Sequence, residues 1–129
     1  MNWYKKRGTV YGNKYGNKRV EHAGRRFDSK LEKAVYDVLL LRQAAGELVE
    51  VQQQCTIHLT RALIGLRVDF RCKKADGEIL YIEGKGFETP EWGIKLRLWR
   101  HYGPGPLEIW KGSAAKPYLH ETVIPKGET

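Results

Sequence analysis

Residues 66–86 read LRVDFRCKKADGEILYIEGKG, and this stretch predicts two antiparallel strands joined by a short hairpin. Apolar and polar side chains alternate on both sides of a central break, as they do in strands with one buried face. The break, Ala75-Asp76-Gly77, suits a three-residue loop with Gly77 in the left-handed conformation. The length of this loop decides which side chains of the two strands face each other.

A three-residue loop places two acidic side chains opposite each other. Asp69 then faces Glu83 with the Cβ atoms roughly 5 Å apart, whereas a two-residue turn would place Asp69 opposite Gly84. Lys85 shares a face with Glu83, because residues two apart on a strand point to the same side. Two bare carboxylates this close repel, and a bound cation would relieve the repulsion. Two carboxylates, an amine and a divalent cation could together position water at a scissile phosphodiester.

A simpler interpretation is also open, in which these groups are solvated charges on an outer strand face. Arg67, Arg71 and Lys73 lie on the same alternation as Asp69 and could pair with it. Short motifs match by accident at an appreciable rate, so the strand pattern alone leaves both interpretations standing.

The composition is that of one domain without a membrane segment. The chain has 129 residues, and no apolar run approaches the ~20 residues that span a bilayer. No apolar signal segment follows the basic N-terminus, so we expect a cytoplasmic protein (host-cell cytoplasm if a phage encodes it). Cys55 and Cys72 should then be reduced, and the four histidines show no zinc spacing with them.

The net charge of +8 is concentrated at the N-terminus. Residues 1–26 hold eight basic side chains against one acidic side chain, and aromatic residues and a tandem YGNK repeat are interleaved with them. This composition suits phosphate contacts and base stacking, although a solubilising tail or an expression remnant would look the same. We expect a basic, partly flexible arm over 1–26 and a single domain over 27–129. The expected DNA-binding residues of the arm are Lys5, Lys6, Arg7, Lys14, Lys18, Arg19, Arg25 and Arg26.

Helix and strand signals alternate along the rest of the chain. Ser29-x-x-Glu32 matches a capping box, and Thr89-Pro90 is a typical helix start. The order helix, strand, strand, strand, helix, strand predicts an α/β layer fold, a mixed sheet flanked by two helices. The expected helices cover 29–45 and 89–102, and the expected strands cover 48–59, 66–73, 78–84 and 107–110, with a further strand that could follow over 118–124.

Two features of these strands bear on the site. The alternation over 48–59 puts Val49 and Gln53 on one apolar face, where Gln53 could be a satisfied core amide or a site residue. Gly84 and Gly86 flank Lys85, and their missing side chains would let a ligand or a DNA backbone approach closely.

This pattern resembles the PD-(D/E)xK nuclease superfamily, whose core runs helix, three strands, helix, strand. In that core the Asp lies on the second strand and (Glu/Asp)-x-Lys on the third. The likeness covers about residues 15–111 and is carried by the segments FDSKLE (27–32), VDF (68–70) and IEGKG (82–86). Within this superfamily, the sequence is similar to phage junction-resolving enzymes of the endonuclease I type and to small phage proteins predicted to be nucleases. The nuclease subunit of transposon-end-cleaving machinery has a comparable pattern. Val68 stands where the superfamily usually has proline.

The resemblance implies a role for each matching residue. Asp69 and Glu83 would bind the metal, with the Gly84 carbonyl as a further ligand, and Lys85 would orient the attacking water or stabilise charge on the phosphate. Glu32 matches an acidic residue of the first helix that helps to bind metal or water. Glu32 is also the last residue of the capping box, and one carboxylate is not expected to serve both purposes. The expected catalytic set is Glu32, Asp69, Glu83 and Lys85.

The all-oxygen donor set implies Mg²⁺, with Mn²⁺ able to substitute. The expected function is a metal-dependent DNA endonuclease that selects branched DNA or Holliday junctions, and such enzymes cut two strands symmetrically as homodimers. Lys95, on the second expected helix, is a further candidate for DNA contact. Two alternatives stay open: a non-catalytic nucleic-acid-binding module on a nuclease-like scaffold, and a nuclease subunit that needs a partner protein, as in transposition or phage packaging.

Overall fold

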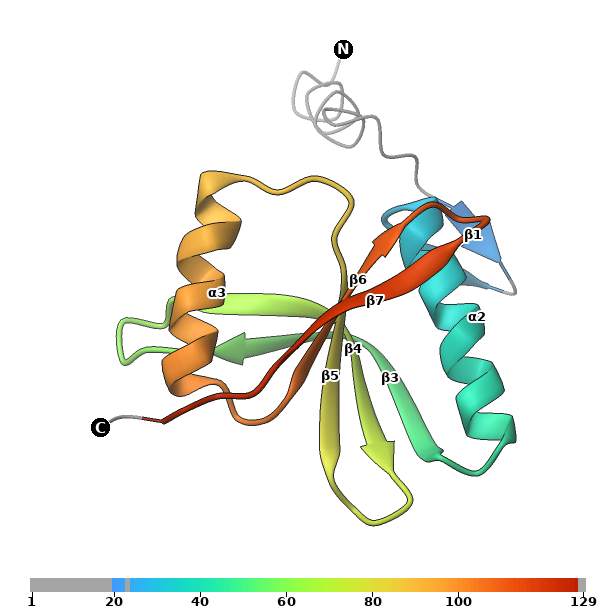
Figure 1. Cartoon of the computed structure of the whole chain (residues 1–129), viewed down its shortest axis with the longest axis horizontal. Coiled ribbons are helices and arrows are strands. Elements are labelled where there is room, and N and C mark those ends of the chain that lie inside the picture. Colours follow the sequence, from blue (N-terminus) through green and yellow to red (C-terminus); the bar gives the residue numbers. More distant parts are fainter. Residues whose placement is uncertain (1–19, 23, 128–129) are drawn as a thin grey trace.

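The computed structural model describes residues 20–22 and 24–127 (Figure 1). The elements are β1 (Val20–His22), β2 (Arg25–Phe27), α2 (Lys30–Ala44), β3 (Leu48–His58), β4 (Gly65–Lys74), β5 (Ile79–Gly84), α3 (Pro90–Tyr102), β6 (Leu107–Gly112) and β7 (Pro117–Val123). The expected order is confirmed from α2 to β6, and β7 is the further strand. The short hairpin formed by β1 and β2 was not expected, and it falls at the end of the predicted arm.

Both helices begin where the sequence predicts. The Ser29 side chain accepts a hydrogen bond from the Glu32 main-chain N–H at 3.0 Å and so caps α2. Thr89 caps α3 in the same way through the N–H of Trp92 at 3.1 Å, and Pro90 occupies the first turn. These caps fix the position at which each helix enters the fold, next to the ends of the strands.

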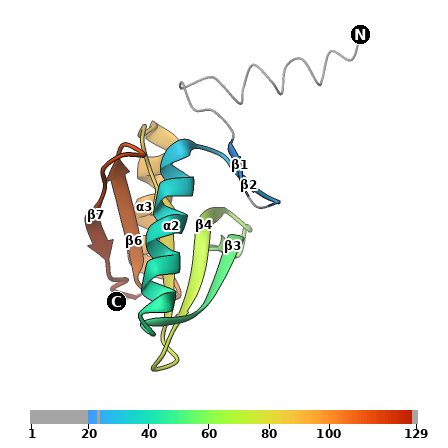
Figure 2. The ribbon, with the colours of Figure 1, turned by 90° about the vertical axis from the view of Figure 1, so that its right-hand side faces the viewer.

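The five-stranded sheet is mixed and lies between the two helices. Its order is β3-β4-β5-β6-β7, with β5 parallel to β6 and the other neighbours antiparallel. Each face of the sheet packs against one helix, and successive residues of β5 point to opposite faces. Leu80 and Ile82 pack in the core under α2, whereas Tyr81 packs against Trp99 of α3. Figures 1 and 2 show α2 and α3 on opposite sides of the strands. The sequence prediction of a mixed sheet flanked by two helices is therefore confirmed.

The ribbon of β3 and β4 bends sharply in its middle. Phe70 packs in the α2 core, but Leu66 and Val68, on the same alternation of β4, pack in the α3 core. The pairing of β4 with β5 ends at Phe70, while its pairing with β3 continues to Gly65. In Figure 1 the ribbon swings away from β5 at this point. Gln54, which lies between the paired residues Gln53 and Cys55 of β3, has a φ of +54°, a conformation that non-glycine residues rarely adopt.

The prediction of which residues form the apolar face of β3 is wrong at the start of the strand. Leu48 is buried, whereas Val49 is 54% exposed, because the register shifts by a β-bulge between Leu48 and Glu50. The bulge turns Leu48 into the core under α2. Further along β3, Gln53 donates a hydrogen bond to the main-chain carbonyl of Arg26. Gln53 is therefore a satisfied amide whose partner is the β1–β2 hairpin, and its side chain also lowers the pKa of Glu32, so it borders the site as well.

The end of the predicted arm lies against the domain. Besides the Gln53 contact to Arg26, the Arg25 guanidinium lies 5.4 Å from the centroid of the Tyr36 ring on α2. The remaining predicted DNA-binding residues of the arm lie outside the described residues; they are Lys5, Lys6, Arg7, Lys14, Lys18 and Arg19. Neither helix in the described part of the chain is long and apolar enough to cross a membrane.

Candidate functional site

The hairpin between β4 and β5 has the predicted loop. Gly77 adopts a φ of +91°, and the Lys74 N–H donates to the Glu78 carbonyl at 2.8 Å. The strand pairs that follow run in step from this loop up to Phe70 opposite Ile82. The next position in the same register is Asp69 beside Glu83, as the sequence predicts.

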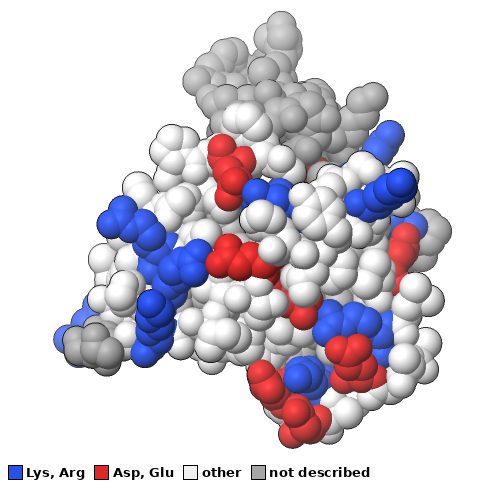
Figure 3. All heavy atoms as spheres, in the orientation of Figure 1, with Lys and Arg blue, Asp and Glu red and all other residues white. Residues whose placement is uncertain are grey.

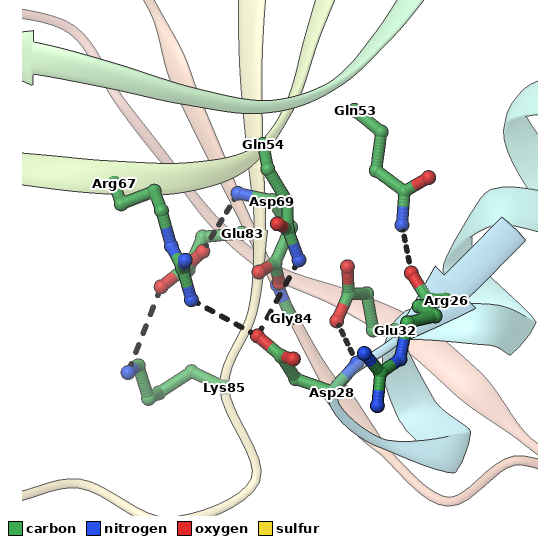
Figure 4. Close-up of polar contacts among 10 residues, drawn as sticks. All are labelled: Arg26, Asp28, Glu32, Gln53, Gln54, Arg67, Asp69, Glu83, Gly84 and Lys85. Carbon is green, nitrogen blue, oxygen red and sulfur yellow. Dashed lines mark hydrogen bonds and ion pairs between the residues drawn. The ribbon is translucent and has the colours of Figure 1, made fainter. Parts of the chain in front are cut away.

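Regular strand pairing stops at these two acids, and their side chains take its place. The Asp69 main-chain N–H donates to Glu83 Oε1 at 3.0 Å, and the Gly84 N–H donates to Asp69 Oδ2 at 2.8 Å (Figure 4). Each carboxylate thus satisfies a main-chain N–H at the point where the strands part. The bend in the β3–β4 ribbon creates the gap, and the acids fill it.

Lys85 completes this group from the end of β5. Its Nζ atom lies 3.6 Å from Glu83 Oε2 and 4.4 Å from the centroid of the Trp92 ring. Its main-chain N–H donates to the Trp110 carbonyl at 2.8 Å, which extends the parallel pairing of β5 and β6 by one residue. The ammonium group is therefore held between a carboxylate and an aromatic face.

Glu32 brings a third carboxylate to the site from the first turn of α2. Its Oε2 atom accepts from the Asp28 N–H at 2.7 Å, while its Oε1 atom is buried and has no hydrogen-bond partner. The two oxygens of Glu32 therefore face different groups, and the expectation that this residue does not serve as both cap and site residue stays a prediction. A buried carboxylate oxygen without a partner lowers the stability of the folded protein, and binding of a cation or a hydrogen-bond donor at this atom would recover that stability.

The space that the missing side chain leaves at Gly84 is bounded by Asp69, Leu31 and Glu32. A Cβ atom there would lie 3.5 Å from Asp69 Oδ2 and 3.8 Å from the Cα of Glu32. These are ordinary van der Waals distances, so the start of α2 lies directly beside the end of β5 at this residue, and Glu32 lines the same cleft as the other two acids. A Cβ at Gly86 would meet nothing within 4 Å, so an approach from solvent is open there.

These groups line one cleft of about 360 Å³. Its walls come from the start of α2, the bend of β4, the end of β5 and the first turn of α3. All four predicted catalytic residues lie in it, together with Gly84 and Lys95. The lining residues are Asp28, Ser29, Glu32, Leu66, Arg67, Asp69, Glu83, Gly84, Lys85, Thr89, Glu91, Trp92 and Lys95.

The three acids are strongly perturbed by burial. Burial, followed by the negative charge of Asp69, raises the pKa of Glu32 to about 7. Burial also raises the pKa of Glu83 to about 7, although the Lys85 charge opposes the shift. Burial and the charge of Glu83 raise the pKa of Asp69 well above its usual value. Desolvation is the largest cause for all three acids, so the cleft keeps them protonated up to a higher pH than water does.

This environment weighs against the interpretation of Asp69 and Glu83 as solvated surface charges. Glu83 is only 5% exposed, and Asp69 is partly buried with its Oδ2 bonded to Gly84. Arg67, one of the three basic residues that could pair with Asp69 in that interpretation, instead contacts Asp28 Oδ2 through Nη2 at 3.1 Å. The acids face the cleft rather than open solvent.

Three further residues belong to this region and were not predicted as site residues. Asp28 precedes the α2 cap, Arg67 lies two residues before Asp69 on β4, and Gln54 Nε2 lies 3.5 Å from Asp28 Oδ2. Arg67 shares the alternation of Asp69, so the sequence held a signal for it. The sequence holds no signal for Gln54, because nothing in it predicts a left-handed glutamine within a strand.

The donor chemistry fits a hard divalent cation, and the present side-chain arrangement does not yet enclose one. In the described part of the chain, no three acidic, histidine or cysteine side chains are already grouped to hold a metal ion. The free Oε1 of Glu32 and the all-oxygen set are the features that suit Mg²⁺.

Comparison with known families places the chain by its sequence. The family described as "Protein of unknown function (DUF1064)" matches residues 12–110. The chain belongs to the DUF1064 family. No curated protein and no solved structure matches it. Every residue that lines the cleft lies within the range matched by DUF1064.

Proposed function

We propose that this DUF1064 protein is a metal-dependent DNA endonuclease of the PD-(D/E)xK type. One observation carries the proposal: Glu32, Asp69 and Glu83, from three different elements, converge with Lys85 in a single cleft. Burial raises the pKa values of all three acids, and carboxyl groups with raised pKa values in a cleft are typical of functional sites.

The proposed cofactor is Mg²⁺, with Mn²⁺ able to replace it. Asp69 and Glu83 would hold the ion, with the Gly84 carbonyl and the free oxygen of Glu32 as further donors. A bound divalent ion polarises a phosphoryl oxygen and lowers the pKa of a coordinated water. A cation would also offset the negative charge that burial makes unfavourable in the cleft.

The protein groups would act on phosphate and water around this ion. The Lys85 ammonium, held between Glu83 and the Trp92 face, can donate hydrogen bonds to a phosphate oxygen or to the attacking water. Glu32, with a pKa near neutrality, can accept a proton from water through its free oxygen. Lys95, on the first turns of α3, lies where it can contact the DNA backbone at the edge of the cleft.

The proposed substrate is branched DNA, with the protein acting as a homodimer that cuts two strands. The resemblance to junction-resolving enzymes and the small size of the chain support this choice. Basic side chains gather over α3 in Figure 3, and α3 itself carries Lys95, Arg97 and Arg100. The first turn of α3 borders the cleft, so a DNA backbone on this helix could continue into it.

The decisive experiment measures Mg²⁺-dependent cleavage of a four-way junction, a nicked duplex and a linear duplex. We expect Glu83→Ala and Lys85→Ala to lose cleavage by at least about 100-fold, as loss of a preorganised charge does in other enzymes. Asp37→Asn and Lys73→Ala, outside the cleft, serve as matched controls and should cut like wild type.

The same assay separates the alternatives. Equal cleavage by Glu83→Ala and wild type would eliminate the assigned site, and equal rates on linear duplex and junction would eliminate the preference for branches. DNA binding without turnover of any substrate would instead identify a non-catalytic module. Turnover that appears only with a second protein would identify a partner-dependent subunit.

A further inference from the structure

The cations that line the cleft all contact acids of the same cleft. Two of these ion pairs are local, because each joins residues of one strand or of one turn of a helix. The third spans the cleft from β4 to the segment before α2. The pairs are Lys85 with Glu83 at 3.6 Å, Lys95 with Glu91 at 3.1 Å, and Arg67 with Asp28 at 3.1 Å.

In the pair that spans the cleft, two side chains of the β3–β4 ribbon contact the Asp28 carboxylate. Asp28 Oδ2 accepts a hydrogen bond from Arg67 Nη2 at 3.1 Å and also lies 3.5 Å from Gln54 Nε2 (Figure 4). Gln54 has a positive φ, and its side chain points toward Asp28 (Figure 4). The Asp28 carboxylate thus contacts two donors of the β3–β4 ribbon, of which Arg67 lines the cleft.

This contact is weak enough to be exchanged. The Arg67 and Asp28 side chains are 59% and 46% exposed, and an ion pair this open to water contributes little to stability. A guanidinium group binds the two free oxygens of a phosphodiester at least as well as a carboxylate, through two parallel hydrogen bonds. A phosphate that enters the cleft can therefore take the place of Asp28 at little cost.

We propose that Arg67 is a phosphate-binding residue and that Asp28 holds its guanidinium in position until DNA replaces the carboxylate. The inference rests on the proposed function, because it takes DNA as the ligand of the cleft. It adds a DNA contact that lies two residues from Asp69 on the same face of β4, so bound backbone would be led directly to the acids.

The test measures binding of a labelled duplex and of a four-way junction to the full chain in EDTA, over a range of salt concentrations. Arg67→Gln should weaken binding several-fold and make the salt dependence shallower by about 0.9, the value for one lost phosphate contact. Asp28→Asn should tighten binding several-fold, because it frees Arg67. In the double variant the gain should disappear, since no guanidinium remains to be freed.

Two matched variants control for the change of one charge. Arg71→Gln removes a cation four residues along β4 and outside the cleft, and Asp37→Asn removes an acid that is paired with Lys33 on α2. The proposal is overturned if Arg67→Gln behaves like Arg71→Gln. It is equally overturned if the gain of Asp28→Asn persists without Arg67 or is matched by Asp37→Asn.

The outcome does not depend on catalysis. Binding in EDTA involves no cleavage, so the proposed function could fail in the cleavage assay while Arg67 still proves to bind DNA. Conversely, normal DNA binding by Arg67→Gln would leave the cleavage results of the Glu83 and Lys85 variants intact. The exposed positions of Arg67 and Asp28 make unfolding of these variants unexpected, and circular dichroism would verify it.

Discussion

Asp69 and Glu83 lie beside each other where β4 and β5 part, and each carboxylate accepts a hydrogen bond from the main chain of the opposite strand. This reciprocal arrangement holds two acids together that would otherwise repel. Hydrogen bonds from these N–H groups favour the charged form of each acid and lower its pKa. Burial has the larger effect, so the pKa of both acids is raised. The fold therefore holds the two acids in place, in surroundings that disfavour their charged forms.

The raised pKa values predict how the stability of the metal-free protein changes with pH. A carboxyl group whose pKa is higher in the folded state binds its proton more tightly there, so the folded state loses stability as pH rises through this window. For Glu32 and Glu83 the window runs from the ordinary value of 4.5 to about 7. We expect the free energy of unfolding to fall by on the order of 1–3 kcal/mol across it, as measured by urea unfolding.

Glu83→Gln provides the control for this pH dependence, and its slope between these pH values should be smaller. Glu47 and Glu88 do not interfere, because ion pairs lower their pKa values and they act below 4.5. A stability that is flat or that rises between pH 5 and 7 would contradict the assignment.

Mg²⁺ should reverse this loss. Only ionised carboxylates bind the ion, so the increase in melting temperature at millimolar Mg²⁺ should be larger at pH 8 than at pH 5. Asp69→Asn should abolish the increase, whereas Asp37→Asn, at an exposed acid on α2, should retain it. An increase that is the same at both pH values, or that survives in Asp69→Asn, would place the ion elsewhere.

Glu32→Gln should change stability and activity in opposite directions. The amide can still accept the Asp28 N–H, and it removes the buried charge whose Oε1 has no partner. At pH 8 without metal we expect the variant to be more stable by about 1 kcal/mol and to cut DNA at least about tenfold more slowly. A variant that is both less stable and fully active would show that Glu32 serves only as a helix cap.

The face of Trp92 should matter for catalysis through Lys85. Trp92→Phe keeps an aromatic face under the ammonium, whereas Trp92→Leu removes it. Both changes open space in the core, so both should lower stability. Only Trp92→Leu should show a several-fold lower kcat at unchanged KM, and equal kinetics of the two variants would argue against this role.

The basic arm has a prediction of its own. Deletion of residues 1–18 removes five Lys or Arg side chains, so the salt dependence of DNA binding should become shallower by a few units if most of them contact phosphate. Titrations of the full and truncated chains at several salt concentrations would measure this. An unchanged slope would show that the arm does not contact DNA.

Much of the site could be predicted from local signals. Gly77 indicated the loop length, the loop set the register, and the register placed Asp69 beside Glu83 with Lys85 next in line. The helix starts followed from Ser29 and Thr89. These features depend on residues close in the sequence, where steric and hydrogen-bonding preferences act directly.

The sequence by itself therefore determined the order of the elements and the two acids and lysine of one hairpin. Only the tertiary structure decided that the β3–β4 ribbon bends at Gln54, that Glu32 reaches the acids over Gly84, and that Arg67 bonds to Asp28. Each of these depends on how distant elements pack, and packing forces both the bend and the close approach of α2. The buried charge of the cleft arises from that packing, because a carboxylate on an isolated hairpin would remain in water.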